Sequence, residues 1–372
     1  MKILIMHHCD SWGGAGVSLV DICNMLRDEN KVTVCVPHMD SEVAREVEKI
    51  KDITLISLED DMGMISAYNG GPKTLSRTFV KNYLQAIKNR EQIHQILKRE
   101  KYDVVLLNSI TLSWMAKIIS QKNIISVCYV RETAVNNLGF RMTLFNLKQY
   151  CSGVVFISEY DQKEMPLTVP TAVVCDCCSS ELLEKGEKCR VSKLNRSTSF
   201  NFHVVFLGGD DELKGYPVIV EAMKRLRKYP IKLVVAGRVK DSFRIEDEHI
   251  EYVGKVTDIS EVLSSADVLV FPSVKGHQGR PIFEAGAFRV PVVVSDFPQT
   301  AGEVKNGENG FVFAPMDSEE LAEKILWLFE HPKESLLMGE KNYLNTRDKH
   351  TLEINAEKLN VFLLDIKKGF DK

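Results

Sequence analysis

The stretch FHVVFLGGDDELKGYPVIVEAMKRLRKY, residues 202–229, joins a short apolar run, a turn with three glycines and an amphipathic segment. The apolar run predicts a buried strand, and the apolar residues at helical spacing after the glycines predict a helix. The same order recurs in KILIMHHCDSWGGAGVSLVDICNMLRD, residues 2–28. The chain therefore repeats a unit of strand, glycine turn and helix, which is typical of α/β folds.

Further apolar runs follow each copy of this unit. In the first half they are KVTVCVP, ITLIS, YDVVLLN, NIISVCYV and GVVFIS, and in the second half KLVVAG, IEYVG, VLVFPS and VPVVVSD. Continuous apolar strands that alternate with helices predict parallel sheets covered on both faces. We therefore expect an α/β fold of two Rossmann-like, doubly wound domains, with the carboxyl ends of both sheets facing a cleft.

The polar segment 181–199, ELLEKGEKCRVSKLNRSTS, is the best linker candidate. It predicts a first domain over residues 1–185 and a second over 195–350. Residues 351–370 have a helical apolar pattern but follow the last strand of the second domain. We therefore expect this helix to pack on some other surface.

Composition excludes several classes of protein. The 372 residues are 44% hydrophobic and 27% charged, with a net charge of -3, so no general attraction to nucleic acid is expected. No apolar run approaches the roughly 18 residues of a membrane span, and MKILIMHHCD predicts a first strand rather than a secretion signal. The nine cysteines fit reduced thiols in the cytoplasm. The run Cys175, Cys177 and Cys178, with Cys189 beyond it, lacks the paired spacing of zinc sites, so no metal is expected.

The glycine turns predict anion sites rather than a dinucleotide or ATP site. The G-x-G-x-x-G fingerprint that starts at Gly14 fails at Leu19, and the second strand ends in VCVPH, where an NAD site carries an acid. The Walker spacing is absent. Glycines still let the backbone approach a phosphate, and a helix N-terminus presents unpaired N–H groups. Lys214 adds a cation at the second turn, although a solvated loop lysine is the alternative.

A carboxylate stands between two apolar strands in GHQGRPIFEAGAFRVPVVVSDF, residues 276–297. Pro281 predicts the start of a helix, and Glu284 is expected in its first turn, facing the cleft. There it can accept both hydroxyls of a ribose, while the loop N–H groups and Lys214 bind a diphosphate. Alternatively, Glu284 only complements the helix dipole, an effect worth about 0.5 kcal/mol.

Together these motifs resemble the retaining glycosyltransferases of the GT-B fold that carry a Glu-x7-Glu motif, the family 4-like enzymes of glycan and polysaccharide biosynthesis. The resemblance rests on the GGAG loop, GVVFISEY, LGGDDELKG, ADVLVFPS, GRPIFEAGAFRVPVVVSD and NGENGFVFAPMDSEELAEKI. It implies a metal-independent cytoplasmic transferase (EC 2.4) without a cofactor. It also implies a nucleotide-diphosphate sugar in the second domain, a glycan or lipid-linked acceptor in the first, and retention at the anomeric carbon. Residues 351–370 would cross back to the first domain.

The resemblance assigns donor-binding roles residue by residue. Glu284 would hold the ribose, Lys214 the diphosphate, and the first glycine loop would approach the phosphates and the transferred sugar. The implied donor-binding set is Gly14, Ala15, Gly16, Gly209, Lys214, Gly237, Arg238, Lys255, Val256, Gly279, Arg280, Pro281, Ile282 and Glu284.

Three positions depart from the family pattern. The first Glu of the motif falls on Gly276, followed by His277 and Gln278. The family's arginine before the lysine is Gly209, and its first-domain histidine is Arg131. Each departure is compatible with a different sugar or with lost activity.

We hypothesise that other side chains compensate for these losses. Arg280 would supply charge at the diphosphate, and His277 or Gln278 would meet the sugar. The predicted catalytic residues are Arg131, Glu132 and His277. The alternatives are an Arg280 that extends into solvent and a surface ion pair between Arg131 and Glu132.

Two rival functions stay open: a sugar-nucleotide epimerase of the same architecture, and a non-catalytic sugar-nucleotide-binding relative. The basic segment 73–101 carries Val80, Tyr83, Leu84 and Ile87 at helical spacing. It predicts either peripheral contact with the anionic inner face of a membrane, near a lipid-linked acceptor, or a core-packing helix with a solvated basic face.

Overall fold

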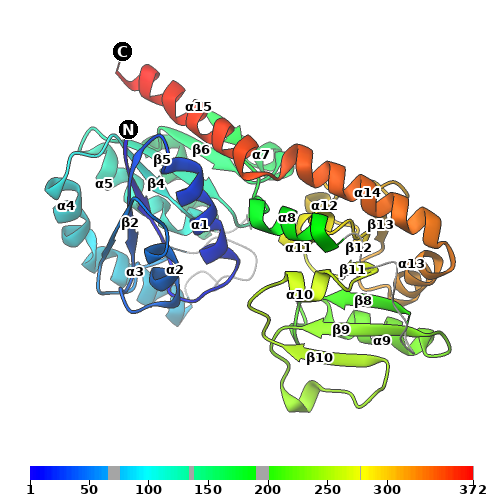
Figure 1. The fold of residues 1–372 in the computed structure, drawn as a ribbon. Helices are drawn as coiled ribbons and strands as arrows, with labels where there is room; N and C mark the ends of the chain where they lie inside the picture. The colour runs from blue at the N-terminus through cyan, green and yellow to red at the C-terminus, as the bar shows by residue number, and fades with distance from the viewer. Residues whose placement is uncertain (66–75, 134–137, 190–200, 277, 372) are drawn as a thin grey trace. The chain divides into compact units, whose positions relative to one another are not determined.

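The computed structural model describes residues 1–65, 76–133, 138–189, 201–276 and 278–371. The chain divides into two compact units, one made of Met1–Asp176 with Leu352–Lys372 and the other of Cys177–Thr351. Each unit is a parallel β-sheet with helices packed against it, and each is described by itself (Figure 1). The predicted α/β class with two doubly wound sheets is therefore confirmed.

The first unit has a seven-stranded sheet in the order β3-β2-β1-β4-β5-β6-β7, with all neighbouring strands parallel. Its strands are β1 (Lys2–Met6), β2 (Lys31–Val36), β3 (Ile53–Ser57), β4 (Val104–Leu107), β5 (Ile125–Val130), β6 (Gly153–Phe156) and β7 (Thr171–Val173). Every residue of β4 and β5 is buried. Burial on both faces explains why these strands are continuous apolar runs rather than alternating ones.

The second unit has a six-stranded parallel sheet in the order β10-β9-β8-β11-β12-β13. Its strands are β8 (Phe202–Phe206), β9 (Ile231–Ala236), β10 (Ile250–Gly254), β11 (Val268–Phe271), β12 (Val292–Ser295) and β13 (Gly310–Phe313). Val204 and Phe206 pack into one hydrophobic cluster, whereas Val205 packs into another. Successive side chains of a strand point to opposite faces, so this sheet lies between two apolar cores.

Helices connect the strands of both sheets. In the first unit they are α1 (Gly14–Leu26), α2 (Glu42–Glu48), α3 (Arg77–Lys88), α4 (Arg90–Arg99), η1 (Ile110–Met115), α5 (Ala116–Ser120), α6 (Leu138–Tyr150), α7 (Glu159–Glu164) and α15 (Leu352–Phe370). In the second unit they are α8 (Ser180–Cys189), α9 (Tyr216–Leu226), η3 (Asp241–Phe243), α10 (Ser260–Leu263), α11 (Arg280–Ala287), α12 (Pro298–Ala301), α13 (Ser318–Glu330) and α14 (Pro332–Lys349). Within the described ranges, no helix is both long and apolar enough to cross a membrane.

The last helix, α15, belongs to the first unit, where it packs beside α1 (Figure 1). Asn360 Nδ2 donates to the Met25 carbonyl at 3.1 Å, and Asn30 Nδ2 donates to Asn360 Oδ1 at 2.9 Å. Leu359 and Leu363 on the same helix are completely buried. The expectation that residues 351–370 cross back to the first domain is confirmed.

The division between the units lies earlier than the sequence suggested. Residues 181–189 were expected to contribute to a linker, but they belong to α8, which packs on α10 and α11 of the second unit. A Cβ on Gly186 would collide with the Ala287 carbonyl, so the helices approach closely. The polar composition of α8 reflects one exposed face of a packed helix. Residues 190–199 of the expected linker lie outside the described residues.

Both sheets have one topological switch point, where the order of strands reverses. It lies between β1 and β4 in the first unit and between β8 and β11 in the second. Ligands of open α/β sheets bind outside the carboxyl ends of the strands at such points. The loops that follow these four strands are therefore the places to look for a site.

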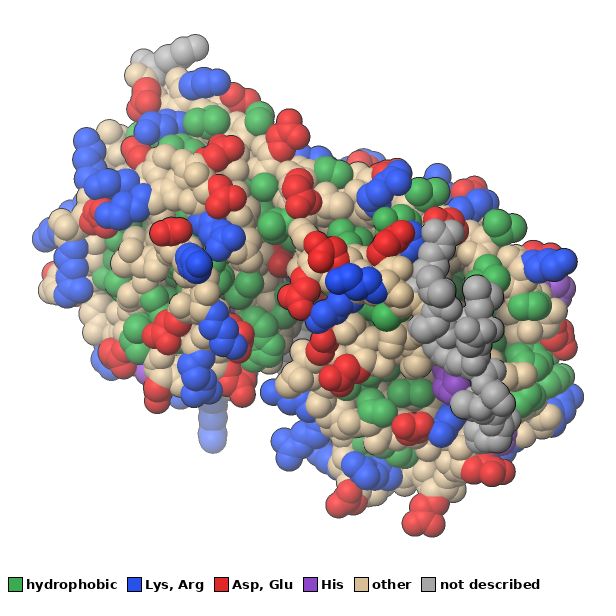
Figure 2. Space-filling model, viewed as in Figure 1, with side chains coloured by type: hydrophobic (Ala, Val, Ile, Leu, Met, Phe, Trp, Pro, Cys, Tyr) green, Lys and Arg blue, Asp and Glu red, His purple; other side chains and the backbone are tan. Residues whose placement is uncertain are grey.

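Acidic and basic side chains are interspersed over the visible face, with Lys and Arg gathered near α4 (Figure 2). This mixture agrees with the net charge of -3. A large surface field of a single sign, such as nucleic-acid-binding proteins carry, is not seen on this face.

Candidate functional site

Glycine turns follow three neighbouring strands of the second unit. Gly209, Gly237 and Gly254 have φ values of 61°, 119° and 73°, which favour glycine. Gly209 N–H donates to the Ala236 carbonyl at 3.0 Å, and Gly237 N–H donates to the Gly254 carbonyl at 2.7 Å. The turns after β8, β9 and β10 are thus hydrogen-bonded side by side, and they present backbone rather than side chains.

Gly209 occupies the position where the resembled family has an arginine. Its left-handed backbone strains any L-residue, and a Cβ would collide with the carbonyl oxygen of Arg238 and lie 3.1 Å from its nitrogen. An arginine therefore does not fit this backbone. The conformation of the turn therefore requires glycine at 209. If the diphosphate needs the positive charge of the family's arginine, another residue must supply it.

Helix α11 begins at Arg280, with Gly279 as an extended N-cap residue and Pro281 in the first turn. Pro281 has no N–H, and the Ile282 N–H donates to the Gly279 carbonyl at 2.9 Å. Anion binding at the start of this helix stays a prediction. Ile282 is buried, so only its backbone can reach a ligand. Glu284 was expected in the first turn, but no acidic residue lies there; it is half-buried in the second turn. Pro281 places the helix start earlier than expected, which moves Glu284 farther from the dipole end.

Two predicted donor-binding lysines lie on exposed turns at this edge. Lys214 precedes α9, next to Gly215, whose φ is 90°. Lys255 follows β10, directly before the half-buried Val256. In the described part of the chain, neither ammonium group takes part in a hydrogen bond or an ion pair. Each is therefore a cation available to an external anion.

Arg280 was proposed to compensate for the lost arginine at the diphosphate. Its guanidinium Nη1 donates to the Cys177 carbonyl at 2.8 Å, and its Cζ lies 5.6 Å from the centroid of the Phe283 ring. The alternative of a side chain extending into solvent is therefore wrong. The guanidinium holds the start of α11 against the segment that leads into α8, and a role at a diphosphate stays a prediction.

Gly276 occupies the position of the first Glu in the family motif. A Cβ there would collide with Oε1 of Gln299 and lie 2.9 Å from its Cδ. Gln299 is buried at the start of α12, and its Oε1 has no hydrogen-bond partner among the residues that the structure describes. The glutamine side chain therefore fills the space that a glutamate side chain at 276 would enter. His277, a predicted catalytic residue, lies outside the described residues.

In the first unit, the predicted glycine loop leads into α1. The helix begins at Gly14 with Gly13 as N-cap, and a Cβ on either glycine would meet nothing within 4 Å. Ala15 is half-buried, and Gly16 is buried with its Cα hydrogens facing Trp12, whose ring would lie 2.9 Å from a Cβ. Gly16 is thus required for packing, while the backbone around Gly14 is open to a ligand.

Arg131 was predicted to act at the reaction centre, with a surface ion pair to Glu132 as the alternative. The structure shows a different, buried pair: Arg131 Nη1 lies 2.5 Å from Asp176 Oδ1, and the side chains are only 9% and 17% exposed. Its Nε donates to Asn108 Oδ1 at 2.9 Å, and its guanidinium lies 4.4 Å from the Tyr129 ring centroid. Arg131 is therefore bound on three sides by protein groups, which suits a positioning residue.

Glu132 is half-buried just after the end of β5 rather than exposed. Burial raises the pKa of its carboxyl, while hydrogen bonds from Ser109 and from the N–H groups of Ile110 and Arg131 oppose that rise. These bonds hold the carboxylate against the start of η1. They explain why a partly buried acid is tolerated here.

His7, His8 and Cys9 form the one group in the described residues whose ligand atoms lie close enough to hold a metal ion. Arg131 donates to the Asn108 oxygen, so the Asn108 amide nitrogen donates to His7 Nδ1 at 3.0 Å. Burial, with the nearby charges of His8 and Arg131, lowers the pKa of His7, so the ring is neutral and its proton sits on Nε2, 3.3 Å from Cys9 Sγ. His7 then offers no lone pair to a metal at that atom. The donor set does not fit an ion.

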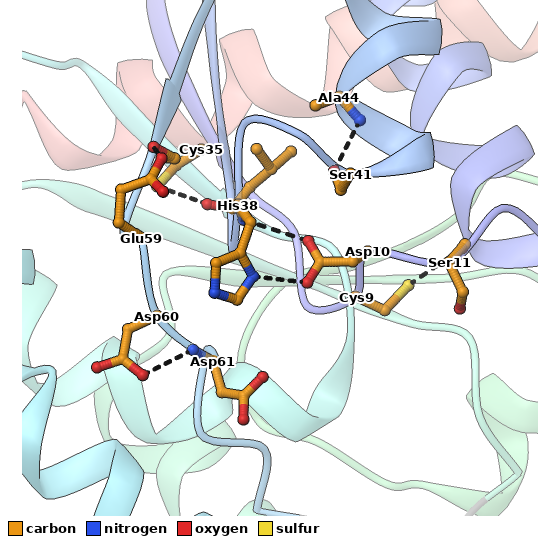
Figure 3. Close-up of polar contacts among 12 residues, drawn as sticks. Cys9, Asp10, Ser11, Cys35, His38, Ser41, Ala44, Glu59, Asp60 and Asp61 are labelled. Atoms are coloured by element: carbon orange, nitrogen blue, oxygen red, sulfur yellow. Dashed lines mark hydrogen bonds and ion pairs between the residues drawn. The ribbon is translucent and has the colours of Figure 1, made fainter.

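The pair Asp10–His38 was not anticipated from the sequence. Asp10 follows β1 and His38 follows β2, and these strands are neighbours. Asp10 Oδ2 lies 2.7 Å from His38 Nδ1, and its Oδ1 accepts from the His38 backbone N–H at 3.2 Å (Figure 3). Polar residues at the ends of two predicted strands were the available signal, but the strand order was needed to pair them.

The comparisons with known proteins agree with this arrangement. Residues 201–331 match the family model described as glycosyl transferases group 1. The solved structure of Anabaena HepE in complex with UDP and glucose is 17% identical, with a TM-score of 0.76 and coverage of 98% of this chain and 99% of that one. The chain has the GT-B fold. Its glycine turns and α11 therefore lie in the second of the two GT-B domains, within the matched residues.

Curated relatives match over shorter segments. A phosphatidyl-myo-inositol mannosyltransferase of Mycobacterium leprae is 31% identical over 139 residues, 34% of this chain and 37% of the relative. An N,N'-diacetylbacillosaminyl-diphospho-undecaprenol alpha-1,3-N-acetylgalactosaminyltransferase of Campylobacter jejuni is 32% identical over 84 residues, 23% of this chain and 22% of the relative. The matched part of the chain thus spans well under half of either relative's length.

Proposed function

We propose that the protein is a glycosyltransferase that moves a sugar from a nucleotide-diphosphate donor to a glycan or lipid-linked acceptor in surface polysaccharide or glycoconjugate synthesis. The main observation behind this proposal is that the residues matched to glycosyl transferases group 1, 201–331, contain the hydrogen-bonded glycine turns and the start of α11. The GT-B fold and the names of the relatives support the same reaction class.

The donor would bind at the carboxyl edge of the second sheet. The backbone of Gly209 and Gly237 would let a nucleotide approach closely, and α11 would direct the positive end of its dipole toward a diphosphate. Lys214 supplies the mobile cation, since its ammonium is exposed and unpaired within the described ranges. Glu284 would hold the ribose hydroxyls from the second turn of the same helix.

The mechanism would rest on positioning and charge. As the bond from the anomeric carbon to the diphosphate breaks, negative charge grows on the leaving oxygens, and the preformed N–H groups with Lys214 stabilise it. The acceptor hydroxyl would attack from the face the diphosphate leaves, passing its proton to a phosphate oxygen, with retention of configuration. This route needs neither a metal nor a carboxylate nucleophile. In the first unit, Arg131 would act by fixing Asp176 and Asn108 rather than by touching the sugar.

Two observations favour a second candidate, a non-catalytic sugar-nucleotide-binding protein. Both Gly209 and Gly276 stand where the resembled family has charged side chains. The backbone at Gly209 does not accept one, and at Gly276 the Gln299 side chain would have to move. A binding protein would keep the nucleotide-binding turns of the second sheet but lose the contacts to the transferred sugar. It would bind a nucleotide sugar without hydrolysing or transferring it.

An exposed apolar stripe on α3 supports a lipid-linked acceptor. Val80, Tyr83, Leu84 and Ile87 are 45%, 40%, 60% and 44% exposed. Core packing of this helix instead uses Phe79 and Ala86, the buried residues of α3. With the neighbouring Lys and Arg side chains of α3 and α4, the stripe suits the surface of an anionic membrane. The names of two relatives that act on lipid-linked substrates point the same way.

A thermal-shift screen against a panel of nucleotide-diphosphate sugars tests the donor proposal. A donor at 100 times its dissociation constant adds about 2.7 kcal/mol of stability. The hit is then incubated with an extract of lipid-linked and free glycans, and the anomeric configuration of any product is read by NMR. Absence of any stabilisation across the panel overturns the proposal, and binding without turnover favours the non-catalytic candidate.

Co-sedimentation with vesicles tests the membrane contact separately. The protein is expected to pellet with vesicles containing phosphatidylglycerol and to stay in solution with pure phosphatidylcholine. Leu84→Glu should abolish pelleting, whereas Leu336→Glu, an equally exposed leucine on α14, should not. Equal pelleting of the wild type with both vesicle types would contradict an electrostatic membrane contact.

A further inference from the structure

The Asp10–His38 pair holds an imidazole in one defined orientation. The Asp10 carboxylate accepts from both the backbone N–H and the Nδ1–H of His38, so the ring cannot rotate without losing a hydrogen bond. The second ring nitrogen, Nε2, has no hydrogen bond to any described residue. The His38 and Asp10 side chains are 35% and 36% exposed, so a ligand in solution can reach them. A carboxylate that orients an imidazole leaves Nε2 ready to bind an external group.

The pair is tied to the glycine loop of the first unit. Asp10 lies three residues before Gly13, and its carbonyl accepts from the Val43 N–H at 3.2 Å. Trp12 N–H donates to Glu42 Oε2 at 2.8 Å, which fixes the middle of the same loop to α2. Asp10 and the N-terminus of α1 therefore share the loop after β1, which is anchored to α2, whereas His38 comes from the neighbouring loop after β2. Asp10 therefore connects the imidazole to the loop that the resemblance assigns to the transferred sugar.

Among the described residues, carboxylates dominate the charges near this imidazole. The hydrogen bond to Asp10 raises the pKa of His38, and the charges of Asp10, Asp61 and Glu59 raise it further, against the effect of desolvation. In Figure 3 Asp10 lies beside the imidazole, and Asp61 lies below it. The nearby ammonium of Lys88 is engaged with Asp60 at 2.6 Å. An incoming carboxylate or phosphate would therefore meet net negative charge, whereas a neutral hydroxyl would not.

We propose that the Asp10–His38 pair binds a hydroxyl group of the acceptor sugar, and that the surrounding carboxylates exclude acceptors that carry an acid on that ring. With the Nδ1–H donated to Asp10, Nε2 of the imidazole accepts a hydrogen bond from the acceptor hydroxyl. His38 is a specificity-determining residue in this scheme, and no bond is made or broken by it. This inference rests on the proposed glycosyltransferase function, because it concerns the acceptor of that reaction.

The test follows the His38 ring directly. Full-length protein labelled with ¹³C-histidine is titrated with the methyl glycosides of glucose, galactose, mannose and N-acetylglucosamine, and with methyl glucuronide. The Cε1–Hε1 signal of His38 is assigned by its absence in His38→Asn, which keeps a donor for Asp10 but lacks Nε2. At least one neutral glycoside is expected to shift this signal, and the glucuronide to bind about three- to tenfold more weakly at neutral pH. In Asp61→Asn that discrimination should shrink, whereas in Asp40→Asn, an exposed acid of the same loop, it should not.

Two results overturn the inference: no neutral glycoside shifts the His38 signal, or the glucuronide binds as tightly as the neutral sugars. The thermal stability of His38→Asn is measured first, and Asp61→Asn provides an independent readout should the histidine variant unfold. Nucleotide-sugar binding is recorded on the same samples. A failure of that binding contradicts the proposed function, whereas intact donor binding with an unresponsive His38 contradicts only the acceptor site.

Discussion

Gly276 faces the buried side chain of Gln299, so closely that a Cβ on the glycine would lie 2.9 Å from the glutamine Cδ. The two residues come from different loops, one after β11 and the other after β12, and these strands are hydrogen-bonded neighbours. The glycine at 276, in place of the motif glutamate, thus leaves the space that the Gln299 side chain fills. A larger residue at 276 requires the Gln299 side chain to move.

Gly276→Glu alone is expected to destabilise the protein by about 1–3 kcal/mol, because the new side chain must displace Gln299. The double variant Gly276→Glu with Gln299→Ala should recover most of this loss, as measured by urea denaturation. Gly302→Glu, where a Cβ would meet nothing within 4 Å, is the matched control and should be nearly neutral. Equal stability of Gly276→Glu and the wild type would contradict the packing argument.

The second prediction concerns the affinity of the second unit for a nucleotide sugar. Lys214→Ala and Glu284→Gln should each weaken binding of the stabilising nucleotide sugar roughly 10- to 100-fold, since each removes one charge-assisted hydrogen bond. Unfolding midpoints should change little, because Lys214 is exposed and Glu284 keeps its shape as glutamine. Isothermal titration calorimetry measures the affinities. Lys224→Ala and Glu308→Gln, two exposed positions of the same unit, serve as controls, and affinities no lower than theirs would refute the assignment.

Arg131 should matter for stability more than for donor binding. Removing its guanidinium leaves Asp176 largely buried without its ion pair, which typically costs about 3–5 kcal/mol. Arg131→Ala is therefore expected to lower the urea midpoint strongly while nucleotide-sugar affinity in the folded fraction is unchanged. Lys163→Ala, which breaks an exposed pair with Glu159, should cost less than about 1 kcal/mol. A stable Arg131→Ala variant that has lost activity would instead support a direct role of Arg131 at the reaction centre.

The buried pair Glu303–His350 predicts a dependence of stability on pH. Burial alone would raise the pKa of Glu303, but the hydrogen bond and charge of His350, at 2.8 Å, lower it. The folded carboxylate therefore gives up its proton more readily than the unfolded one. Its stabilising effect is complete above the unfolded value of about 4.3 and is lost as the pH falls through the lower folded value.

Urea midpoints measured from pH 7 to pH 3 should show this loss in the wild type. In Glu303→Gln the stability is expected to be lower at pH 7 and to fall less steeply below about pH 4.3, the unfolded value of a glutamate. Glu308→Gln, an exposed acid nearby in sequence, should keep the wild-type slope. If the urea midpoints of Glu303→Gln and the wild type fall in parallel with pH, this pair does not cause the loss of stability in acid.

The strands were predictable because burial on both faces of a parallel sheet demands continuous apolar runs, which a sequence shows directly. The exceptions are β7 and β13, at the sheet edges, which have three and four residues and are only partly buried. Edge strands need fewer apolar side chains, so their signal is weak. The helix after residue 351 was also predictable, because its apolar residues recur at helical spacing and must be buried against another element.

What the sequence by itself determined is the α/β class, the repeated strand, glycine turn and helix, and the position of Glu284 and Lys214 after strands of the second half. Tertiary structure alone decided the partners. Arg131 is paired with Asp176 rather than Glu132, Gly276 packs on Gln299, and Asp10 orients His38. In each case the two residues follow strands whose carboxyl ends share one edge of a sheet, and the order of strands in the sheet selects which loops touch. That order is set by long-range packing, which local patterns of apolar and polar residues do not encode.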